Sequence, residues 1–493
     1  MVPKTLQSDF DFKVFGSVLL GTLLVAIGLG FCAHPLIPYL VLLIFILFVL
    51  SRPEYVYFLF ICLLPIHCFF TLHNNDIYRH INISDIVLVC IFVSWVVSRL
   101  AGTAIPYRGT SCDWPWFFFL FWVVLSLSWT PCPWQGYYEV IKVSGCIFAF
   151  IVTVSLLNNG ERLKYALYIF IAIGVLTALV ASVSFYFSYG FKEVITVWNH
   201  LAITNYFWSD ALHPLRFFFK MRGQALSVPH TTALYINVAF FFALGFLLVE
   251  NSKKGVILWT IALAILMIGM LSTLTKSALG SLWVGMAFFF AHVTRLRNWF
   301  VTCLAVMIAV TILLFIVARA PEIVGSVKYT QEQMDQNASG SSLGERMVLW
   351  KLGLKKLESN YGLGYGEGGF LRFGTNPVPD GTHPAVLFDY GIIGFFLWCF
   401  IFGNAFFEFY SHLKTIVSEY YRRVYLAYLS GYVMMLVIWT VTLHYDYVDL
   451  YVYLGIGYAL IWISQHETFV QECLMFNHKS KSLVRVPFEN HRK

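Results

Sequence analysis

Long apolar runs separated by short polar connections dominate the chain from residue 14 to residue 465. A helix that crosses a bilayer needs about 20 mainly apolar residues, and most of the runs approach or reach that length. They lack the two-residue alternation of an outer-membrane barrel, so helices are predicted throughout. Because two runs are short, we expect an all-α polytopic membrane protein with about 12–14 transmembrane helices. The fourteen predicted spans are 14–33, 36–51, 54–72, 83–100, 115–130, 139–157, 164–189, 231–249, 255–273, 276–293, 299–318, 385–407, 424–443 and 449–465.

The composition agrees with this pattern. Hydrophobic residues make up 59% of the chain and charged residues 12%, which is about half the charged share of an ordinary globular protein. A soluble enzyme, a disordered chain and a disulfide-stapled secreted domain are therefore excluded. The ten cysteines are scattered without a CxxC pair, so neither a disulfide framework nor a metal site is predicted. No P-loop is present, and we expect no nucleotide and no cofactor.

The basic residues predict the orientation of the spans. With the N-terminus inside, nineteen of the 33 lysines and arginines fall in cytoplasmic segments, and eleven others fall in two long outer segments. The short outer connections and span ends hold only Arg79, Lys142 and Lys276. Because basic residues accumulate in the short loops on the cytoplasmic side, both termini are predicted to be cytoplasmic. No cleavage site follows the first apolar run, so we expect it to remain as a span.

A single integral-membrane domain, residues 1–493, is predicted. Two of its outer segments are long, and connections of such length usually carry function. The second outer segment contains an amphipathic helix that begins near Gly344. The glycine-rich residues 362–369 follow, and their backbone N–H groups are candidate phosphate ligands. The apolar face of the helix consists of Met347, Trp350, Leu354 and Leu357, at helical spacing. The predicted segments are the first periplasmic loop 190–230, the second periplasmic loop 319–384, a cytoplasmic interfacial helix at 408–423 and a cytoplasmic tail at 466–493.

Several outward-facing cations form the first set of candidate site residues. Arginine binds phosphate through two N–H groups and lysine binds it as a point charge, so a group of them at one leaflet suits a diphosphate-linked lipid. Contact with ordinary anionic headgroups is the alternative. Lys276 is the stronger candidate because a cation at a span boundary is costly to bury and usually functional. The set consists of Arg216, Lys220, Arg222, Lys276 and Arg346.

A histidine and an aspartate form the second set. His383 precedes an apolar helix on the outer side and can take up a proton near neutral pH, although a histidine of this kind is more often a hydrogen-bonded loop residue. Asp389 lies two turns deeper and could orient a base or a sugar hydroxyl, or could cap a kink near Gly391. The cluster of His444, Asp446 and Asp449 between the last two spans is a weaker alternative.

Three stretches of the chain resemble one family of bacterial membrane enzymes, the superfamily of O-antigen ligases and O-antigen or exopolysaccharide polymerases. These are glycosyltransferases of the GT-C class. The similarity covers residues 210–400 by motif and the whole chain by topology. The stretches are Arg222-Gly223 with Pro229-His230; Thr275-Lys276-Ser277-Ala278; and Arg346, Trp350, Gly362-Leu-Gly-Tyr-Gly, His383 and Gly391-Ile-Ile-Gly394.

The resemblance implies an inverting glycosyltransferase of the bacterial inner membrane whose active site faces the periplasm. The donor would be a glycan on a polyprenyl diphosphate, and the acceptor would be a growing glycan or lipid A core. Arg216, Arg222, Lys276 and Arg346 would neutralise the diphosphate. His383, assisted by Asp389, would deprotonate the acceptor hydroxyl. A chain-length regulator is a possible partner, and no nucleic acid is implied.

The spacing around His383 favours a polymerase over a ligase. His383 lies eight residues before Gly391 rather than the eleven typical of ligases, and Pro384 stands where ligases have Asn. The rival of another class is a flippase for lipid-linked oligosaccharide, and a membrane assembly protein whose loops bind partners is a third alternative. Transporters commonly show internal repeats and paired broken helices. No comparable halves are visible in this sequence.

Overall fold

The computed structural model shows an all-helical protein, with no strand in the part of the chain that it describes. That part comprises residues 53–64, 83–100, 102, 107–131, 133–190, 229–273, 275–293, 350–351, 353–355, 357–366, 381–440 and 448–483. The helices are α3 (Pro53–Leu63), α4 (Ile83–Leu100), α5 (Asp113–Ser126), α6 (Pro133–Leu156), α7 (Gly160–Gly190), α11 (Pro229–Val249), α12 (Lys253–Ser272), α13 (Lys276–His292), α16 (Thr382–Leu413), α17 (Glu419–Ile438) and α18 (Val448–Leu483).

Each predicted span that falls in the described residues coincides with one of these helices, so the prediction of a helical polytopic membrane protein is confirmed at this level. Within the described residues, six helices are long and apolar enough to cross a membrane, namely α6, α7, α11, α12, α16 and α18. A membrane-spanning segment must satisfy its own backbone hydrogen bonds, which is why an apolar run of this length forms a helix. The predicted spans 14–33, 36–51 and 299–318 lie outside the described residues.

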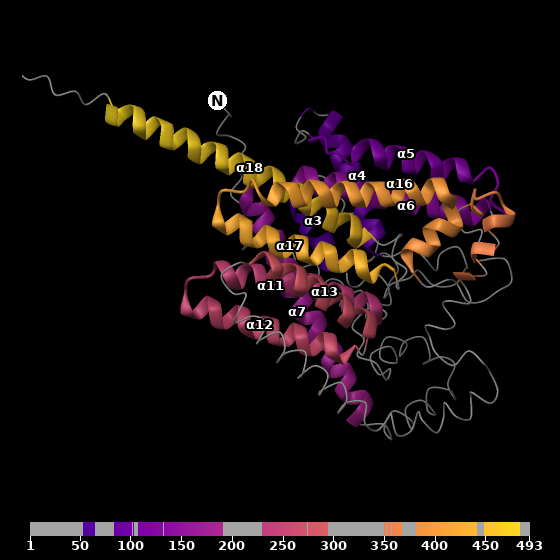
Figure 1. Ribbon diagram of the computed structural model, residues 1–493, viewed down its shortest axis with the longest axis horizontal. Helices are drawn as coiled ribbons and strands as arrows, with labels where there is room; N and C mark the ends of the chain where they lie inside the picture. Colours follow the sequence, from indigo (N-terminus) through magenta and orange to yellow (C-terminus); the bar gives the residue numbers. More distant parts are fainter. Residues whose placement is uncertain are drawn as a thin grey trace, which may run out of the picture.

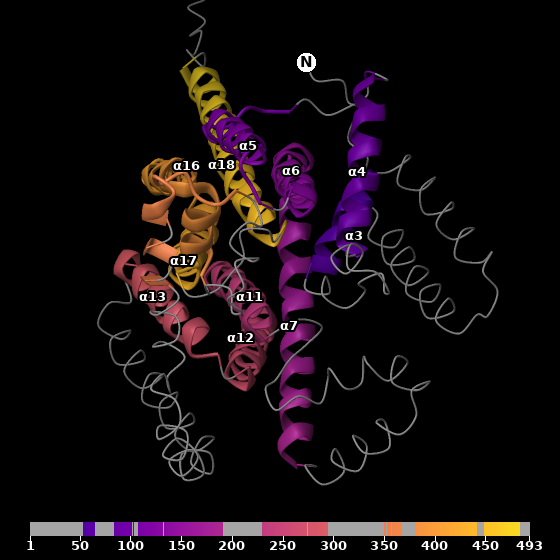
Figure 2. The same ribbon diagram turned by 90° about the vertical axis from the view of Figure 1, so that its right-hand side faces the viewer.

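The helices differ in how deeply they are buried. In α11, 83% of the most apolar window is buried, whereas in α12 the corresponding share is 22%. Both helices are apolar on all sides, so burial separates a central helix from a peripheral one that presents apolar side chains outward. In Figure 2, α6, α12 and α16 are seen nearly end-on, and α7 runs vertically below α6. α7 contacts α3 on the one hand and α11 and α12 on the other, so it connects the N-terminal helix α3 to the pair α11 and α12.

Small residues allow α7 to approach its neighbours closely. A Cβ atom at Gly174 would lie 2.3 Å from the Cβ of Ala239 in α11. A Cβ atom at Gly269 of α12 would lie 2.3 Å from the Cβ of Ala178 in α7. Helix crossings in membranes are commonly built on small residues, because apolar side chains gain little by leaving lipid for protein.

The bundle has two distinct ends. At one end, the last turn of α11 meets the start of α17, where the Arg423 guanidinium donates to the Leu248 carbonyl. His412 near the end of α16 contacts Ser464 of α18 at the same end, 3.0 Å away. Figure 1 shows the α11–α12 and α16–α17 connections together on the left. At the opposite end, the start of α16 meets the end of α17, and the Thr382 N–H donates to the Trp439 carbonyl at 2.8 Å.

The prediction of a separate interfacial helix at 408–423 is wrong. α16 continues to Leu413, a short connection follows, and α17 begins at Glu419. The reason is that Phe409 and His412 are buried against neighbouring helices, so the apolar stripe of α16 extends beyond the predicted end of its span. The predicted tail 466–493 likewise begins as helix, because α18 extends to Leu483.

Candidate functional site

The candidate site on the predicted outer side is centred on a break in α16. Gly391 has φ 70° and ψ −168°, which is not helical and is open essentially to glycine alone. One of the two alternatives for Asp389 places a kink near Gly391, and the structure shows that kink. The break divides α16 into a short first segment and a second segment, 392–413, which at 1.5 Å per residue is about 33 Å long and can cross a bilayer.

Backbone carbonyls that lose their helical partners at the break are satisfied by other parts of the chain. The Tyr365 N–H donates to the Phe388 carbonyl at 3.0 Å, and the Gly366 N–H donates to the Asp389 carbonyl at 2.8 Å. The next carbonyl, that of Tyr390, accepts from the indole N–H of Trp122 in α5 at 2.8 Å. A polar backbone group inside a membrane protein needs such a partner, because lipid offers none.

The glycine-rich segment 362–366 lies directly against the break. Gly362, Gly364 and Gly366 all have positive φ, and the Ile392 N–H donates to the Gly362 carbonyl at 2.9 Å. A Cβ atom on Gly364 would lie 2.3 Å from the Gly391 nitrogen, and one on Gly391 would lie 2.3 Å from the Gly362 carbonyl oxygen. The two backbones therefore approach too closely for a side chain on either of them.

Four of the five N–H groups in the described part of this segment are not available to the phosphate that they are predicted to bind. Besides the Tyr365 and Gly366 N–H groups, the Gly362 N–H donates to the Leu357 carbonyl at 3.0 Å and the Leu363 N–H to the Asn360 carbonyl at 3.1 Å. These four donors are engaged within the protein. The segment acts as a backbone brace for the broken helix.

The described residues between Trp350 and Ser359 are helical, as the amphipathic pattern predicts. Their packing face differs from the predicted one. Leu357 is buried, but Leu354 is 51% exposed. Gly353 takes the central place instead, since a Cβ atom there would lie 2.4 Å from the ring of Phe388. The segment therefore lies on the first part of α16.

His383 connects the start of α16 to two other elements. Its Nδ1 accepts from the Trp398 indole N–H at 3.2 Å, and its Nε2 lies 3.4 Å from the Leu436 carbonyl of α17. An indole N–H can only donate, so Nδ1 carries the lone pair and Nε2 carries the proton. In a straight helix, His383 and Trp398 would be separated by about 22 Å of rise. Their contact shows that the first segment of α16 turns away from the axis of the second.

The other predicted site residues have different outcomes. Asp389 is buried two residues before the break. Lys276 is the first residue of α13, a helix that packs against α17, and its side chain lies outside the described residues. Of the alternative cluster, Asp449 is in the first turn of α18. The predicted residues outside the described part are Arg216, Lys220, Arg222, Arg346, His444 and Asp446.

The structure thus brings His383, Asp389 and the Gly362–Gly366 brace into one unit, and it leaves the diphosphate-binding cations as a prediction. Sequence reasoning missed Trp122, Trp398 and Leu436, which hold this unit in place through an indole, a second indole and a carbonyl. Indole and backbone partners of this kind leave no local signal, because tryptophans are common throughout an aromatic-rich membrane chain.

A second polar site, also missed, lies at the opposite end of the bundle. It is a cavity of about 200 Å³ between the residues before α5, the end of α6, the end of α16 and α18. Glu408 on its wall is a carboxylate within an apolar run, which is a recognised signal for function in a membrane chain. Arg108 also lies on the wall, and in the sequence it is one of the basic residues that predict the orientation of the spans. Comparison with known proteins adds no relative, because no protein-family model and no curated protein matches the chain.

Proposed function

We propose that the chain is a polysaccharide polymerase of the bacterial inner membrane. It transfers a glycan from a polyprenyl-diphosphate carrier to a sugar hydroxyl of the growing glycan at the periplasmic leaflet, without metal or nucleotide. The observation that carries the proposal is the junction at Gly391. Two motif stretches that resemble the polymerase family, 362–366 and 383–394, are joined there by backbone hydrogen bonds.

The placement of the candidate residues supports the proposal. The start of α16 with His383 meets the end of α17 at the predicted outer end. Lys276 is the first residue of α13, which packs against α17. Basic residues such as Arg162, Lys253 and Lys414 lie near the helix ends and connections assigned to the cytoplasmic side. This distribution is the one that the positive-inside rule expects.

In the proposed mechanism, Arg216, Arg222, Lys276 and Arg346 neutralise the departing diphosphate. The acceptor hydroxyl attacks the anomeric carbon as the bond to the diphosphate oxygen breaks, and one displacement inverts that carbon. His383 takes the hydroxyl proton on Nδ1, with Asp389 in support. Because the Trp398 N–H occupies Nδ1, acceptor binding must first displace this hydrogen bond.

A flippase is the second candidate, and the broken helix α16 is the observation that favours it. Discontinuous membrane helices commonly form transporter sites through unpaired backbone groups at the break. Here, however, the carbonyls of Phe388, Asp389 and Tyr390 are bonded to protein donors. That pairing favours a fixed junction over a transport site. A ligase that joins glycan to lipid A core remains the alternative within the same class.

The test is elongation of a synthetic polyprenyl-diphosphate repeat unit by the purified full-length protein in the presence of a metal chelator. We expect polymer from the wild type and none from Arg222→Ala or Arg346→Ala, with Arg422→Ala as the matched control on the opposite side. If both site variants form as much polymer as the wild type, the proposal is wrong.

A deletion strain separates the alternatives. Single repeat units that accumulate outside the membrane indicate a lost polymerase. Polymer that is made but not joined to lipid A core indicates a ligase instead, and units trapped inside indicate a flippase. The last two outcomes contradict the polymerase proposal.

A further inference from the structure

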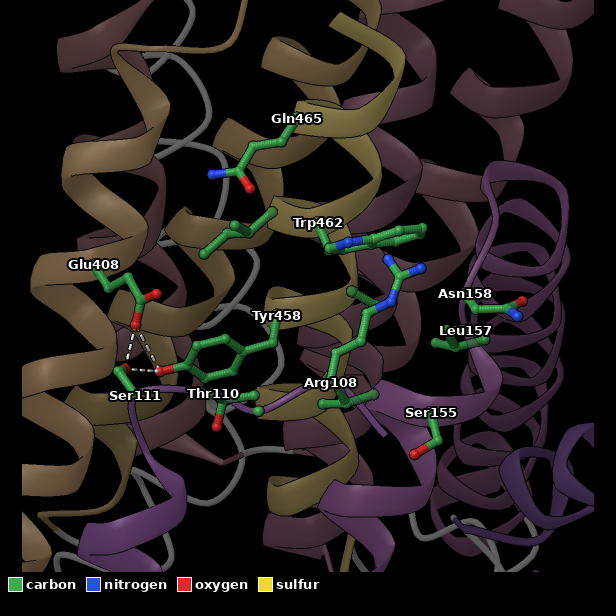
Figure 3. A pocket seen from close by; sticks show the side chains of 14 residues that line it. Arg108, Thr110, Ser111, Ser155, Leu157, Asn158, Glu408, Tyr458, Trp462 and Gln465 are labelled. Atoms are coloured by element: carbon green, nitrogen blue, oxygen red, sulfur yellow. Dashed lines mark hydrogen bonds between the residues drawn. The ribbon is translucent and has the colours of Figure 1, made fainter. Parts of the chain in front are cut away.

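The cavity at the end opposite the α16 break is lined by four segments that are far apart in the sequence. Arg108 to Ser111 come from the connection before α5, Ser155 and Asn158 from the end of α6, Glu408 from α16, and Tyr458 and Trp462 from α18. Figure 3 shows their side chains around a shared space, with Arg108 and Glu408 on opposite sides of Tyr458. A cavity of about 200 Å³ has room for one small polar group.

Arg108 supplies the positive charge of the cavity. Its guanidinium carbon lies 3.0 Å from the centre of the Trp462 ring, so the two side chains form a cation–π contact. Arg108 is exposed to solvent overall, and the partial desolvation of its guanidinium lowers its pKa. Guanidinium N–H groups that are held in place by an aromatic ring and are not used by described neighbours suit a phosphate, which they bind in pairs.

Glu408 supplies the negative charge on the other side. Its Oε2 accepts from the Ser111 hydroxyl and from the Tyr458 hydroxyl, the latter at 3.0 Å. Asn404 donates to Ser111 at 3.0 Å and fixes this hydroxyl in turn. The carboxylate is therefore oriented by hydroxyl donors, and no cation of the described chain pairs with it. Ion pairs between described residues occur at Glu419, on α17.

A cation and a carboxylate held apart in one cavity are complementary to a ligand that carries both charges. A phosphate ester with a primary amine meets this requirement, because the phosphate suits Arg108 and the ammonium suits Glu408. A purely anionic ligand would leave Glu408 without a partner and would face a like charge.

The surroundings indicate that this ligand comes from the bilayer. α5 begins directly after the cavity residues and exposes the aromatic side chains of Trp114, Phe117, Phe118 and Phe121. These side chains form an apolar strip on which acyl chains can lie. Trp462 lines the cavity and is half-buried, as tryptophan commonly is at the interface between headgroups and hydrocarbon.

We propose that this cavity binds the headgroup of an aminophospholipid of the phosphatidylethanolamine type, with its phosphate on Arg108, its ammonium on Glu408 and its chains along α5. The site lies at the end of the bundle away from the α16 break and does not depend on glycan transfer. It makes the protein a specific receptor for a bilayer lipid on the predicted cytoplasmic leaflet.

The experiment is native mass spectrometry of the purified full-length protein in detergent, titrated with phosphatidylethanolamine or with phosphatidylglycerol, which has no amine. We expect the wild type to bind phosphatidylethanolamine about tenfold more tightly, a difference of the size that one charge pair can supply. Arg108→Gln should weaken both lipids, and Glu408→Gln should abolish the preference. Arg422→Gln, at an exposed arginine outside the cavity, is the matched control and should change neither.

Several outcomes would overturn the proposal. Equal affinity of the wild type for both lipids would contradict the role of Glu408. Equal losses of lipid affinity in Arg108→Gln and Arg422→Gln would indicate general attraction to anionic lipid. Soluble O-phosphoethanolamine that binds as tightly as the lipid makes the ligand a free phosphate ester instead. If Arg108→Gln fails to elute as a monodisperse protein, Arg108→Lys, which keeps the charge but loses the paired N–H groups, decides the same point.

Discussion

The two ends of the bundle use polar groups in opposite ways. At the α16 break, the freed carbonyls accept hydrogen bonds from the glycine-rich brace and from Trp122, so the polar groups stabilise an irregular backbone. At the opposite end, Arg108 and Glu408 are held by a ring and by hydroxyls but not by each other. At the first end, the polar groups of the backbone are already engaged in hydrogen bonds within the protein. The second leaves charged side chains available to a ligand.

The largest expected effect is at the junction itself. Gly391→Ala places a Cβ atom 2.3 Å from the Gly362 carbonyl oxygen and forces a side chain into a backbone conformation reserved for glycine. Strain and overpacking together should destabilise the protein by about 3 kcal/mol. Thermal unfolding of the purified protein in detergent measures the loss.

Gly403→Ala is the matched control for that substitution. It lies on the same helix, and a Cβ atom there meets nothing within 4 Å. It should leave the unfolding temperature unchanged or raise it slightly, since alanine favours a helix. Equal unfolding temperatures for the two variants would show that the brace does not constrain Gly391.

The second prediction separates two roles of His383 and rests on the proposed function. His383→Gln keeps an acceptor for Trp398 and a donor toward Leu436, but it cannot take up a proton. If His383 is the base, elongation should fall about 100-fold or more while the unfolding temperature stays close to that of the wild type. Elongation at the wild-type rate would instead make His383 a clasp between α16 and α17.

The helices were predictable, whereas the contacts at each end were not. Every described span followed from its apolar run because a membrane helix satisfies its backbone locally. A kink near Gly391 is one of the alternatives that the sequence offers at Asp389, while the glycine-rich partner 362–366 is from its sequence a candidate phosphate cradle. Both roles need glycines with exposed N–H groups, and the tertiary contact alone decides between them. The cavity was missed because Arg108 and Glu408 are 300 residues apart and meet only through packing.

The third prediction tests whether the freed carbonyls at the break need their partners. Trp122→Phe removes the indole N–H that donates to the Tyr390 carbonyl at 2.8 Å and should destabilise the protein by about 1–2 kcal/mol. Trp114→Phe on the same helix is the control, because this tryptophan is 71% exposed. Unfolding in detergent compares the two. A larger loss from the Trp114 variant would contradict the argument that the break depends on its donors.

The smallest expected effect concerns surface charge at the cavity end. Glu419→Gln removes exposed ion pairs within the first turns of α17, including the 2.8 Å contact with Arg423. Exposed pairs of this spacing contribute about 0.3–0.5 kcal/mol, so the unfolding temperature should fall by little. Lipid preference at the Arg108–Glu408 cavity should be unchanged, as measured by the same titration. A marked loss of stability would mean that the charges at this end hold the fold together, and the contrast between the two ends would fail.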